Sequence, residues 1–286
     1  MEIIEFIKIV LLGIVEGLTE WLPISSTGHM LLFDEFFPVK AFLENPDFGD
    51  LFIVVIQLGA ILAVVLLFWN KIWPFRRTET GGVGIRKEKF ILWTKIAVAC
   101  VPIGIVGLLL EDRIDEFFYQ GNRETLTIAL ALIFYGIMFI GIEALNKKKK
   151  PRFDNLNTMP YQLALYIGMF QCLAVIPGTS RSGATILGAM ILGSSRIMAA
   201  EFTFFLAIPT MAGASLLKLI KYGFAFSGQE YAMLITGMIV AFLVSFFCIK
   251  LLMQYISRHS FAAFGWYRIA LGLFVFVYYV GKYALA

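Results

Sequence analysis

Apolar segments separated by short polar loops make up almost the whole chain. An α-helix needs about 20 apolar residues to cross the hydrocarbon core of a bilayer. Six segments are long enough, namely 50–69, 90–110, 126–145, 199–219, 231–254 and 262–283. This pattern predicts an all-α polytopic membrane protein with six transmembrane helices.

Four further apolar segments form two pairs, namely 3–22 with 25–37 and 160–176 with 184–193. The second arm of each pair is too short to cross the bilayer, and a proline followed by small polar residues (Pro23 or Pro177) separates the arms. Irregular backbone at membrane depth is tolerated only where it is buried in protein or lines a wet cavity. We therefore predict that each pair forms a re-entrant helical hairpin.

The order of segments repeats along the chain, because a hairpin and three spans are followed by a second hairpin and three spans. An odd number of crossings per repeat inserts the second repeat upside down, as in many transporters. The tips also match, with Ser25-Ser26-Thr27-Gly28 against Ser180-Arg181-Ser182-Gly183. We predict one membrane domain over 1–286 with inverted internal symmetry, made of repeat one (about 1–145), a basic linker (146–158) and repeat two (about 159–286).

Composition agrees with the membrane class. Of the 286 residues, 59% are apolar, and the mean hydropathy is +0.82, which excludes an ordinary soluble domain. The first segment does not resemble a cleavable signal peptide, because it begins with Glu2 and Glu5, lacks a basic leader and is interrupted by Glu16 and Glu20. We expect the first helix to remain in the mature protein.

Basic residues are concentrated in alternate loops. They are Lys71, Arg76, Arg77, Arg86, Lys87 and Lys89, then Lys147–Lys150 and Arg152, and finally Arg258. The other loops are acidic or mixed, with Glu44, Asp47 and Asp50 in one and Glu111, Asp112, Asp115 and Glu116 in another. Cytoplasmic loops carry the excess of Lys and Arg. We therefore expect the basic loops in the cytoplasm, both termini outside, and the first hairpin entering from the outer side.

The first tip carries two carboxylates and a run of hydroxyls. Glu16 and Glu20 are four residues apart, so they share a helix face. Ionisable groups at bilayer depth are costly and mark a functional site by default. After Pro23, residues Ser25, Ser26 and Thr27 are suitable N-caps for the next helix, whose free N–H groups then point into the tip.

The second tip repeats this arrangement, with Gly178 freeing the backbone and Thr179 and Ser180 as candidate caps. Two helix N-termini that converge form an anion site. Arg181 adds a planar guanidinium suited to phosphate oxygens. The predicted ligand carries several phosphate-like oxygens and an apolar body. The substrate-binding residues expected from both tips are Ser25, Thr27, Gly178, Thr179, Ser180, Ser182 and Thr185.

Glu16 and Glu20 would repel such an anion. A hard divalent cation, Mg²⁺ or Ca²⁺, resolves this by bridging the two carboxylates and the phosphate oxygens. Either Ser26 or His29 can supply the nucleophile or the proton transfer, because a hydroxyl needs a nearby base to become reactive. The sequence leaves that division of roles open, together with a metal-bound water as nucleophile.

The two tip motifs, Glu16-x3-Glu20-x2-Pro23-x-Ser25-Ser26-Thr27-Gly28-His29 and Pro177-Gly178-x-Ser180-Arg181-Ser182-Gly183-Ala184-Thr185, resemble those of the undecaprenyl-diphosphate phosphatases, the bacitracin-resistance protein family. The resemblance covers essentially the whole chain. It implies a bacterial inner-membrane enzyme that removes the terminal phosphate of undecaprenyl diphosphate on the periplasmic side and so recycles the lipid carrier of peptidoglycan. It also implies that Glu16, Glu20, Ser26, His29 and Arg181 are essential and that a divalent cation is required. We take Ser26 as the nucleophile.

Other functions are weighed against this one. The type-2 phosphatidate phosphatases share Ser-Thr-Gly-His, but their later histidine would fall at Leu187. A rhomboid-like protease needs Gly-x-Ser-Gly, and here Arg181 follows Ser180. A lipid-phosphate flippase with the same architecture and a non-catalytic lipid-binding partner stay open. We expect a polyprenyl diphosphate substrate, a lipid bilayer and no nucleic acid as partners, and a homo-oligomer stays open.

Overall fold

The computed structural model describes residues 2–77, 83–118 and 122–285. It contains the six predicted long helices, and each is long and apolar enough to cross a membrane. They are α4 (Pro46–Leu67), α6 (Lys87–Phe118), α7 (Asn122–Asn146), α10 (Arg196–Tyr222), α11 (Gly228–Ile256) and α12 (Ala262–Leu285). The prediction of an all-helical protein with six spanning segments is confirmed.

The two broken pairs are present with the predicted breaks. The first consists of α1 (Ile3–Thr19) and α2 (Ser26–Phe36), and the second of α8 (Tyr161–Gln171), the 3-10 turn η1 (Cys172–Val175) and α9 (Arg181–Ile191). Both second arms have 11 residues. At 1.5 Å per residue they are about 16 Å long, roughly half the thickness of a hydrocarbon core.

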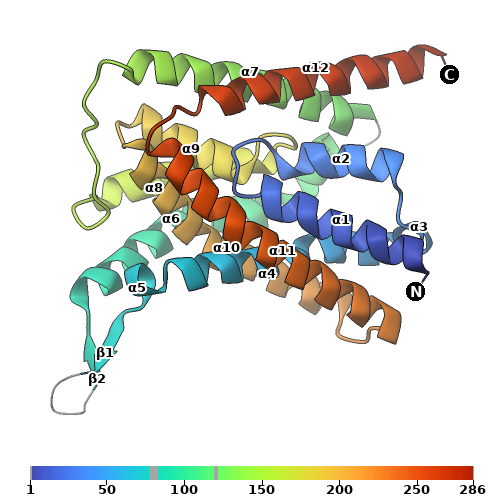
Figure 1. The fold of residues 1–286 in the computed structure, drawn as a ribbon, viewed down its shortest axis with the longest axis horizontal. Coiled ribbons are helices and arrows are strands. Elements are labelled where there is room, and N and C mark those ends of the chain that lie inside the picture. Colours follow the sequence, from blue (N-terminus) through green and yellow to red (C-terminus); the bar gives the residue numbers. More distant parts are fainter. Residues whose placement is uncertain (1, 78–82, 119–121, 286) are drawn as a thin grey trace.

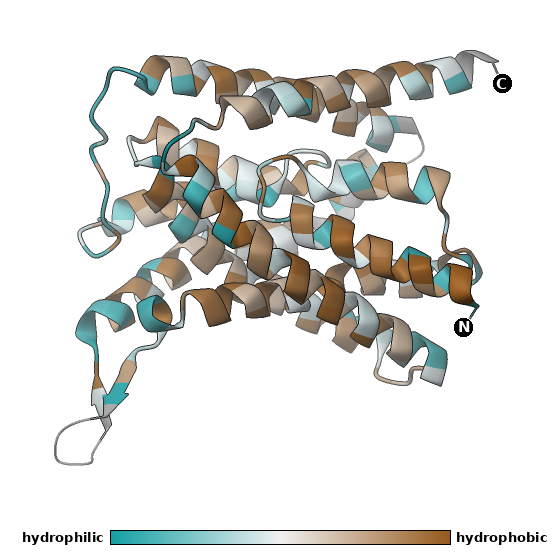
Figure 2. Ribbon diagram, in the orientation of Figure 1, coloured by the Kyte–Doolittle hydropathy of each residue, from teal (hydrophilic) through white to brown (hydrophobic). Residues whose placement is uncertain are grey.

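Several short elements lie where the sequence analysis assigned only loops. They are α3 (Lys40–Glu44), α5 (Trp69–Ile72) and the antiparallel strands β1 (Phe75–Arg77) and β2 (Val83–Ile85), with Phe75 paired to Ile85. Figure 2 shows that the long helices are largely hydrophobic and that hydrophilic residues gather near their ends and in the connections. The short elements therefore extend the ends of the bundle and leave its core unchanged.

The two parts of the chain interlock. Helix α1 packs on α11, α8 packs on α6, α4 contacts α10, and α7 lies along α12 (Figure 1). Glycine permits the closest of these approaches, since a Cβ added to Gly168 on α8 would lie 2.1 Å from Ala99 O on α6. Each pairing joins an element before the linker to one after it. This packing brings the two tips together in the middle of the bundle.

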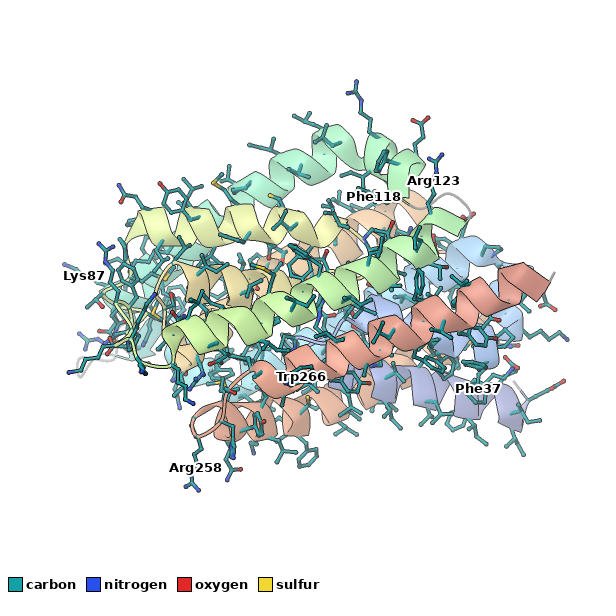
Figure 3. The ribbon with its side chains drawn as sticks, turned by 90° about the horizontal axis from the view of Figure 1, so that it is seen from above. Phe37, Lys87, Phe118, Arg123, Arg258 and Trp266 are labelled. Atoms are coloured by element: carbon teal, nitrogen blue, oxygen red, sulfur yellow. The ribbon has the colours of Figure 1, made fainter. Side chains whose placement is uncertain are left out.

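The basic loops lie at one end of the bundle. Lys87 and Arg258 are at the same end in Figure 3, whereas Phe37, Phe118 and Arg123 lie towards the other. Helix α1 begins and α12 ends at that second end (Figure 1). The charge asymmetry seen in the sequence is therefore an asymmetry between the two faces of the folded molecule.

Candidate active site

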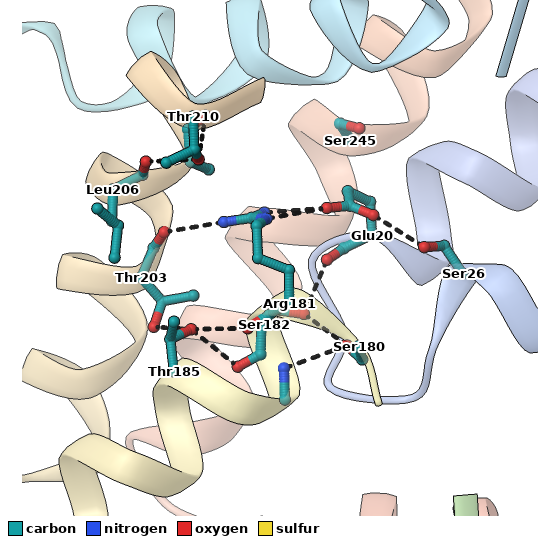
Figure 4. A network of polar contacts seen from close by, with 12 residues as sticks. Glu20, Ser26, Ser180, Arg181, Ser182, Thr185, Thr203, Leu206, Thr210 and Ser245 are labelled. Carbon is teal, nitrogen blue, oxygen red and sulfur yellow. Dashed lines mark hydrogen bonds and ion pairs between the residues drawn. The ribbon is translucent and has the colours of Figure 1, made fainter. Parts of the chain in front are cut away.

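The two tips are joined by an ion pair between side chains that are far apart in the sequence. Arg181 at the start of α9 donates from Nη2 to Glu20 Oε1 at 3.0 Å and from Nε to the same oxygen at 3.3 Å (Figure 4). Nη1 donates to the carbonyl of Thr203 at 3.3 Å. The Glu20 and Arg181 side chains are only 8% and 13% exposed, so each charge depends on the other for compensation.

A second contact joins the backbones of the tips. Ser182 is buried, and its hydroxyl donates to the carbonyl of Glu20 at 2.9 Å. That carbonyl lies just beyond the last residue of α1, so the helix has no backbone N–H to donate to it. The Ser182 hydroxyl therefore completes the end of α1 from the opposite tip.

The helices α2 and α9 begin with the same capping device. Ser25 and Ser180 each accept a hydrogen bond from the backbone N–H three residues on, Gly28 at 3.3 Å and Gly183 at 3.1 Å. These two serines are the only residues other than glycine with positive φ in the part of the chain that the structure describes, at 76° and 69°. Both helices thus start with backbone amides directed into the tips, which favours negative charge between them.

Arg268 on α12 binds the turns of both tips. It is fully buried, and its Nη1 donates to Pro23 O at 3.1 Å. Its Nη2 donates to the carbonyls of Gly178 and Thr179, each at 2.9 Å. Its guanidinium also lies over the ring of Tyr135, 5.4 Å from the ring centre. One side chain therefore satisfies three backbone carbonyls that the broken helices leave free.

Gly178 must be glycine for two reasons. Its φ of +85° is a conformation that other residues rarely adopt. In addition, a Cβ at this position would lie 2.6 Å from the Cα of Ile128 on α7. The second tip can therefore approach α7 only because the residue after Pro177 has no side chain.

Glu16 has no ion-pair partner and no hydrogen bond of good geometry among the described residues. Its side chain is fully buried, and neither carboxylate oxygen is within hydrogen-bonding geometry of a described residue. The charges of Glu20 and Arg181 and the side chain of Gln57 act on it. A buried carboxylate without such a partner is rare and fits a cation ligand. Among the described residues no group of three His, Cys, Asp or Glu side chains gathers to hold a metal. A cation there would therefore depend on Glu16, Glu20 and oxygens from water or a substrate.

Ser26 lies in contact with the carboxylate of Glu20. Its hydroxyl donates to Glu20 Oε2 at 2.9 Å, while Oε1 of the same carboxylate accepts from Arg181 (Figure 4). A hydroxyl that donates to a carboxylate is arranged as a nucleophile with its base. Of the two candidate nucleophiles, Ser26 is thus the one that is hydrogen-bonded to a carboxylate.

His29 is held apart from this network by its own partners. Its Nδ1 lies 2.7 Å from the carbonyl of Ser25, which can only accept, so Nδ1 carries the proton. Its Nε2 lies 2.7 Å from the hydroxyl of Tyr267 on α12. His29 follows Ser26 by three residues and shares its face of α2. Nε2 is therefore the ring nitrogen at which His29 can gain or lose a proton while its bond to Ser25 stays intact.

The other expected substrate-binding residues occupy different surroundings. Thr27 is exposed, Thr179 is buried, and the buried Thr185 hydroxyl donates to the carbonyl of Arg181 at 2.9 Å. The Thr185 hydroxyl also accepts from Thr203 at 2.9 Å. These contacts place Thr185 in the wall behind Arg181, and its contact with a substrate stays a prediction.

Three residues of the site were missed in the sequence analysis, namely Thr203, Tyr267 and Arg268. Only Arg268 carried a signal, because an arginine near the start of the apolar segment 262–283 is costly unless it is partnered inside the protein. Thr203 and Tyr267 are ordinary components of apolar helices. Nothing in the sequence around them indicated that they would contact a tip.

Comparison with known proteins gives one consistent result. The family model described as "Bacitracin resistance protein BacA" matches residues 9–274 of this chain. An undecaprenyl-diphosphatase of Lachnoclostridium phytofermentans is 57% identical over 280 residues, which cover 98% of this chain and 99% of the relative. A protein of the same name from Enterococcus faecalis is 54% identical over 96% of this chain and 97% of the relative. Another from Acetivibrio thermocellus is 54% identical over 97% of this chain and 98% of the relative.

Replacement of Arg268 by leucine tests the clamp on the tips. Arg268→Leu leaves three buried carbonyls without a donor, so we expect a loss of about 3–5 kcal/mol of stability together with loss of the site. The measurement is thermal unfolding of the purified protein in detergent, with Arg258→Leu as control because Arg258 is exposed. Equal melting temperatures for the two variants would contradict the role of Arg268.

Proposed function

The chain belongs to the bacitracin resistance protein BacA family, and we propose that it is a membrane phosphatase that hydrolyses undecaprenyl diphosphate to undecaprenyl phosphate and inorganic phosphate. This reaction recycles the lipid carrier for peptidoglycan and other envelope polymers and confers bacitracin resistance, as the name of the family indicates. The observation that carries the proposal is the meeting of two capped helix N-termini with the Glu20–Arg181 pair and Ser26.

We propose further that α1–α2 and α8–α9 are re-entrant hairpins of an inverted repeat. Alignment of Ser25 with Ser180 pairs two caps of positive φ and places Glu16 opposite Gln171, which is also buried. The length of α2 and α9 and the interlocked packing support the same arrangement. The basic end then lies in the cytoplasm of a bacterial inner membrane, and the site opens to the periplasm.

In this proposal the terminal phosphate lies between the two tips. The amides at the starts of α2 and α9 point to it, and Arg181 donates to its oxygens from a position already fixed by Glu20. Ser180, Ser182 and Gly183 shape the second tip through their mutual hydrogen bonds. The polyprenyl chain extends into the bilayer beside the apolar helices.

The reaction proceeds in two steps. Glu20 accepts the proton of Ser26 as Oγ attacks the terminal phosphorus, and the bond from that phosphorus to the bridging oxygen breaks, which releases undecaprenyl phosphate. Water then attacks the phosphoserine, releases inorganic phosphate and restores the hydroxyl. His29 shuttles a proton at Nε2, its only exchanging nitrogen while Nδ1 remains bonded to Ser25. The carboxylate of Glu20, already hydrogen-bonded to the Ser26 hydroxyl, thus serves as the base for the attack.

Glu16 and Glu20 are the residues that would hold a divalent cation, Mg²⁺ or Ca²⁺. Mg²⁺ is commonly bound by one or two carboxylates together with substrate phosphates, which matches the two glutamates available here. When bound, such an ion neutralises the carboxylates and polarises the phosphate. The buried carboxylate of Glu16, whose oxygens have no hydrogen bond of good geometry among the described residues, supports this assignment.

Purified protein given a C15 or C55 polyprenyl diphosphate tests the function directly. We expect free phosphate, and we expect it to disappear with a chelator, which removes the cation, and in Glu20→Gln, which removes the base and one cation ligand. Glu44→Gln is the matched control, since Glu44 is exposed. Movement of lipid across a vesicle without phosphate release would instead support the flippase.

Removal of the Ser26 hydroxyl tests the nucleophile. We expect Ser26→Ala to lower the rate of single-turnover hydrolysis by roughly 10³-fold or more, as expected when one member of a nucleophile–base pair is lost. The double variant with Glu20→Gln should be little worse than either single variant, because the two groups act as a unit. Substantial turnover by Ser26→Ala would assign the attack to His29 or to water.

The orientation is tested by a reporter fused to the C-terminus. Because α12 ends at the face opposite the basic loops, a phosphatase that is active only in the periplasm should be active in the fusion. A fusion whose reporter works only in the cytoplasm would reverse the proposed orientation.

A further inference from the structure

A polar cavity lies at the basic end of the bundle, away from the tips. It has a volume of about 480 Å³, and its walls come from the linker after α7, the turn between α9 and α10 and the end of α11. We propose that this cavity binds a phosphate group, carried by an anionic lipid headgroup or by a free phosphate ion. The proposal does not rest on the reaction at the tips.

The cavity has an excess of positive charge. Its basic side chains are Lys147, Lys149, Lys150, Arg152 and Arg196. The one acidic side chain, Glu143, is already occupied, because it accepts from Arg196 Nε at 2.8 Å and from the backbone N–H of Phe261 at 2.8 Å. No ion pair within the described part of the chain involves the three lysines. Their charge is therefore available to an anion.

The walls are fixed by backbone hydrogen bonds. The N–H of Arg152 donates to Gly193 O at 2.8 Å, and the N–H of Ser195 donates to Phe153 O at 2.7 Å. Asn146 Nδ2 donates to the carbonyl of Met190 at 3.1 Å. The linker is therefore attached to the turn between α9 and α10, and the lysines extend from an ordered support.

The turn between α9 and α10 offers two kinds of hydrogen-bond donor to an anion, the backbone amides that begin α10 and the hydroxyl of Ser194. The 27-residue helix α10 begins at this turn, so its N-terminus offers free backbone amides to an anion. The Ser195 side chain caps the helix by accepting a hydrogen bond from the N–H of Met198. Ser194, in the cavity wall, is 5% exposed, and its hydroxyl has no hydrogen-bond partner among the described residues. Buried hydroxyls are almost always bonded. A phosphate oxygen in the cavity would supply the missing partner.

The cavity also has an apolar side. Met190, Ile197 and Ile256 line it, and Ile197 is 42% exposed on the surface of the bundle. This side suits the glycerol and the first acyl carbons of a lipid, whereas the lysines suit its phosphate. The cavity lies at the opposite end of the 11-residue helix α9 from Arg181, about 15 Å away along the helix axis. It is therefore a separate site.

The test uses the purified full-length protein and two probes. Native mass spectrometry measures the binding of phosphatidylglycerol against phosphatidylcholine, and thermal unfolding at constant ionic strength measures stabilisation by inorganic phosphate. The pocket variant is Lys149→Gln with Lys150→Gln, and the control is Lys148→Gln, a neighbouring lysine that does not line the cavity. We expect affinity to fall about fivefold for each pocket lysine removed, the fold-change that corresponds to a basic residue near a membrane surface.

Ser194→Ala provides an independent variant. Because the hydroxyl has no partner in the protein, its removal should leave the melting temperature without anion unchanged and weaken anion binding about tenfold. Loss of phosphatidylglycerol binding in the pocket variants supports a lipid headgroup, and loss of stabilisation by inorganic phosphate in the same variants supports the free ion. The proposal is overturned if neither probe binds, or if Lys148→Gln weakens binding as much as the pocket variant.

Discussion

Backbone carbonyls that two broken helices expose inside an apolar bundle need hydrogen-bond donors, and the structure around the tips follows from that need. Water cannot supply these donors in a hydrocarbon environment. Arg268 donates to Pro23 O, Gly178 O and Thr179 O, and the Ser182 hydroxyl donates to Glu20 O. Because one guanidinium bonds both turns, the distance between the tips is fixed. The separation of Ser26, Glu20 and Arg181 depends on that distance.

The charges of the site are divided between the two tips. The carboxylates Glu16 and Glu20 come from the first tip, whereas Arg181 comes from the second. Burial of these groups costs free energy that the Glu20–Arg181 pair only partly offsets. Glu16 lacks even that compensation among the described residues. A site with this imbalance gains from binding both a cation and a phosphate, which agrees with the proposed phosphatase chemistry.

The capping serines connect local strain with function. Ser25 and Ser180 hold positive φ, a conformation that costs about 1–3 kcal/mol for a residue with a side chain. The hydrogen bonds from Gly28 and Gly183 and the packing of the tips maintain it. With these caps the chain turns back over the few residues between α1 and α2 and between η1 and α9, so both α2 and α9 begin at the tips. Strain at the caps thus places two helix N-termini at one point.

Apolar length and the positions of proline and serine are local properties of the chain. They were sufficient to predict six spanning helices, two interrupted pairs and the capping positions, because those features depend on a few neighbouring residues. The short elements α3, α5 and β1–β2 were missed, since segments of three to five residues carry no periodic signal. The role of Arg268 could not be found locally, because its partners lie 245 and 90 positions away and only the packing of α12 across both tips brings them together. The chain's local pattern identified the polar residues that interrupt its apolar segments. The fold decided which of them meet, because those contacts join segments from opposite parts of the chain.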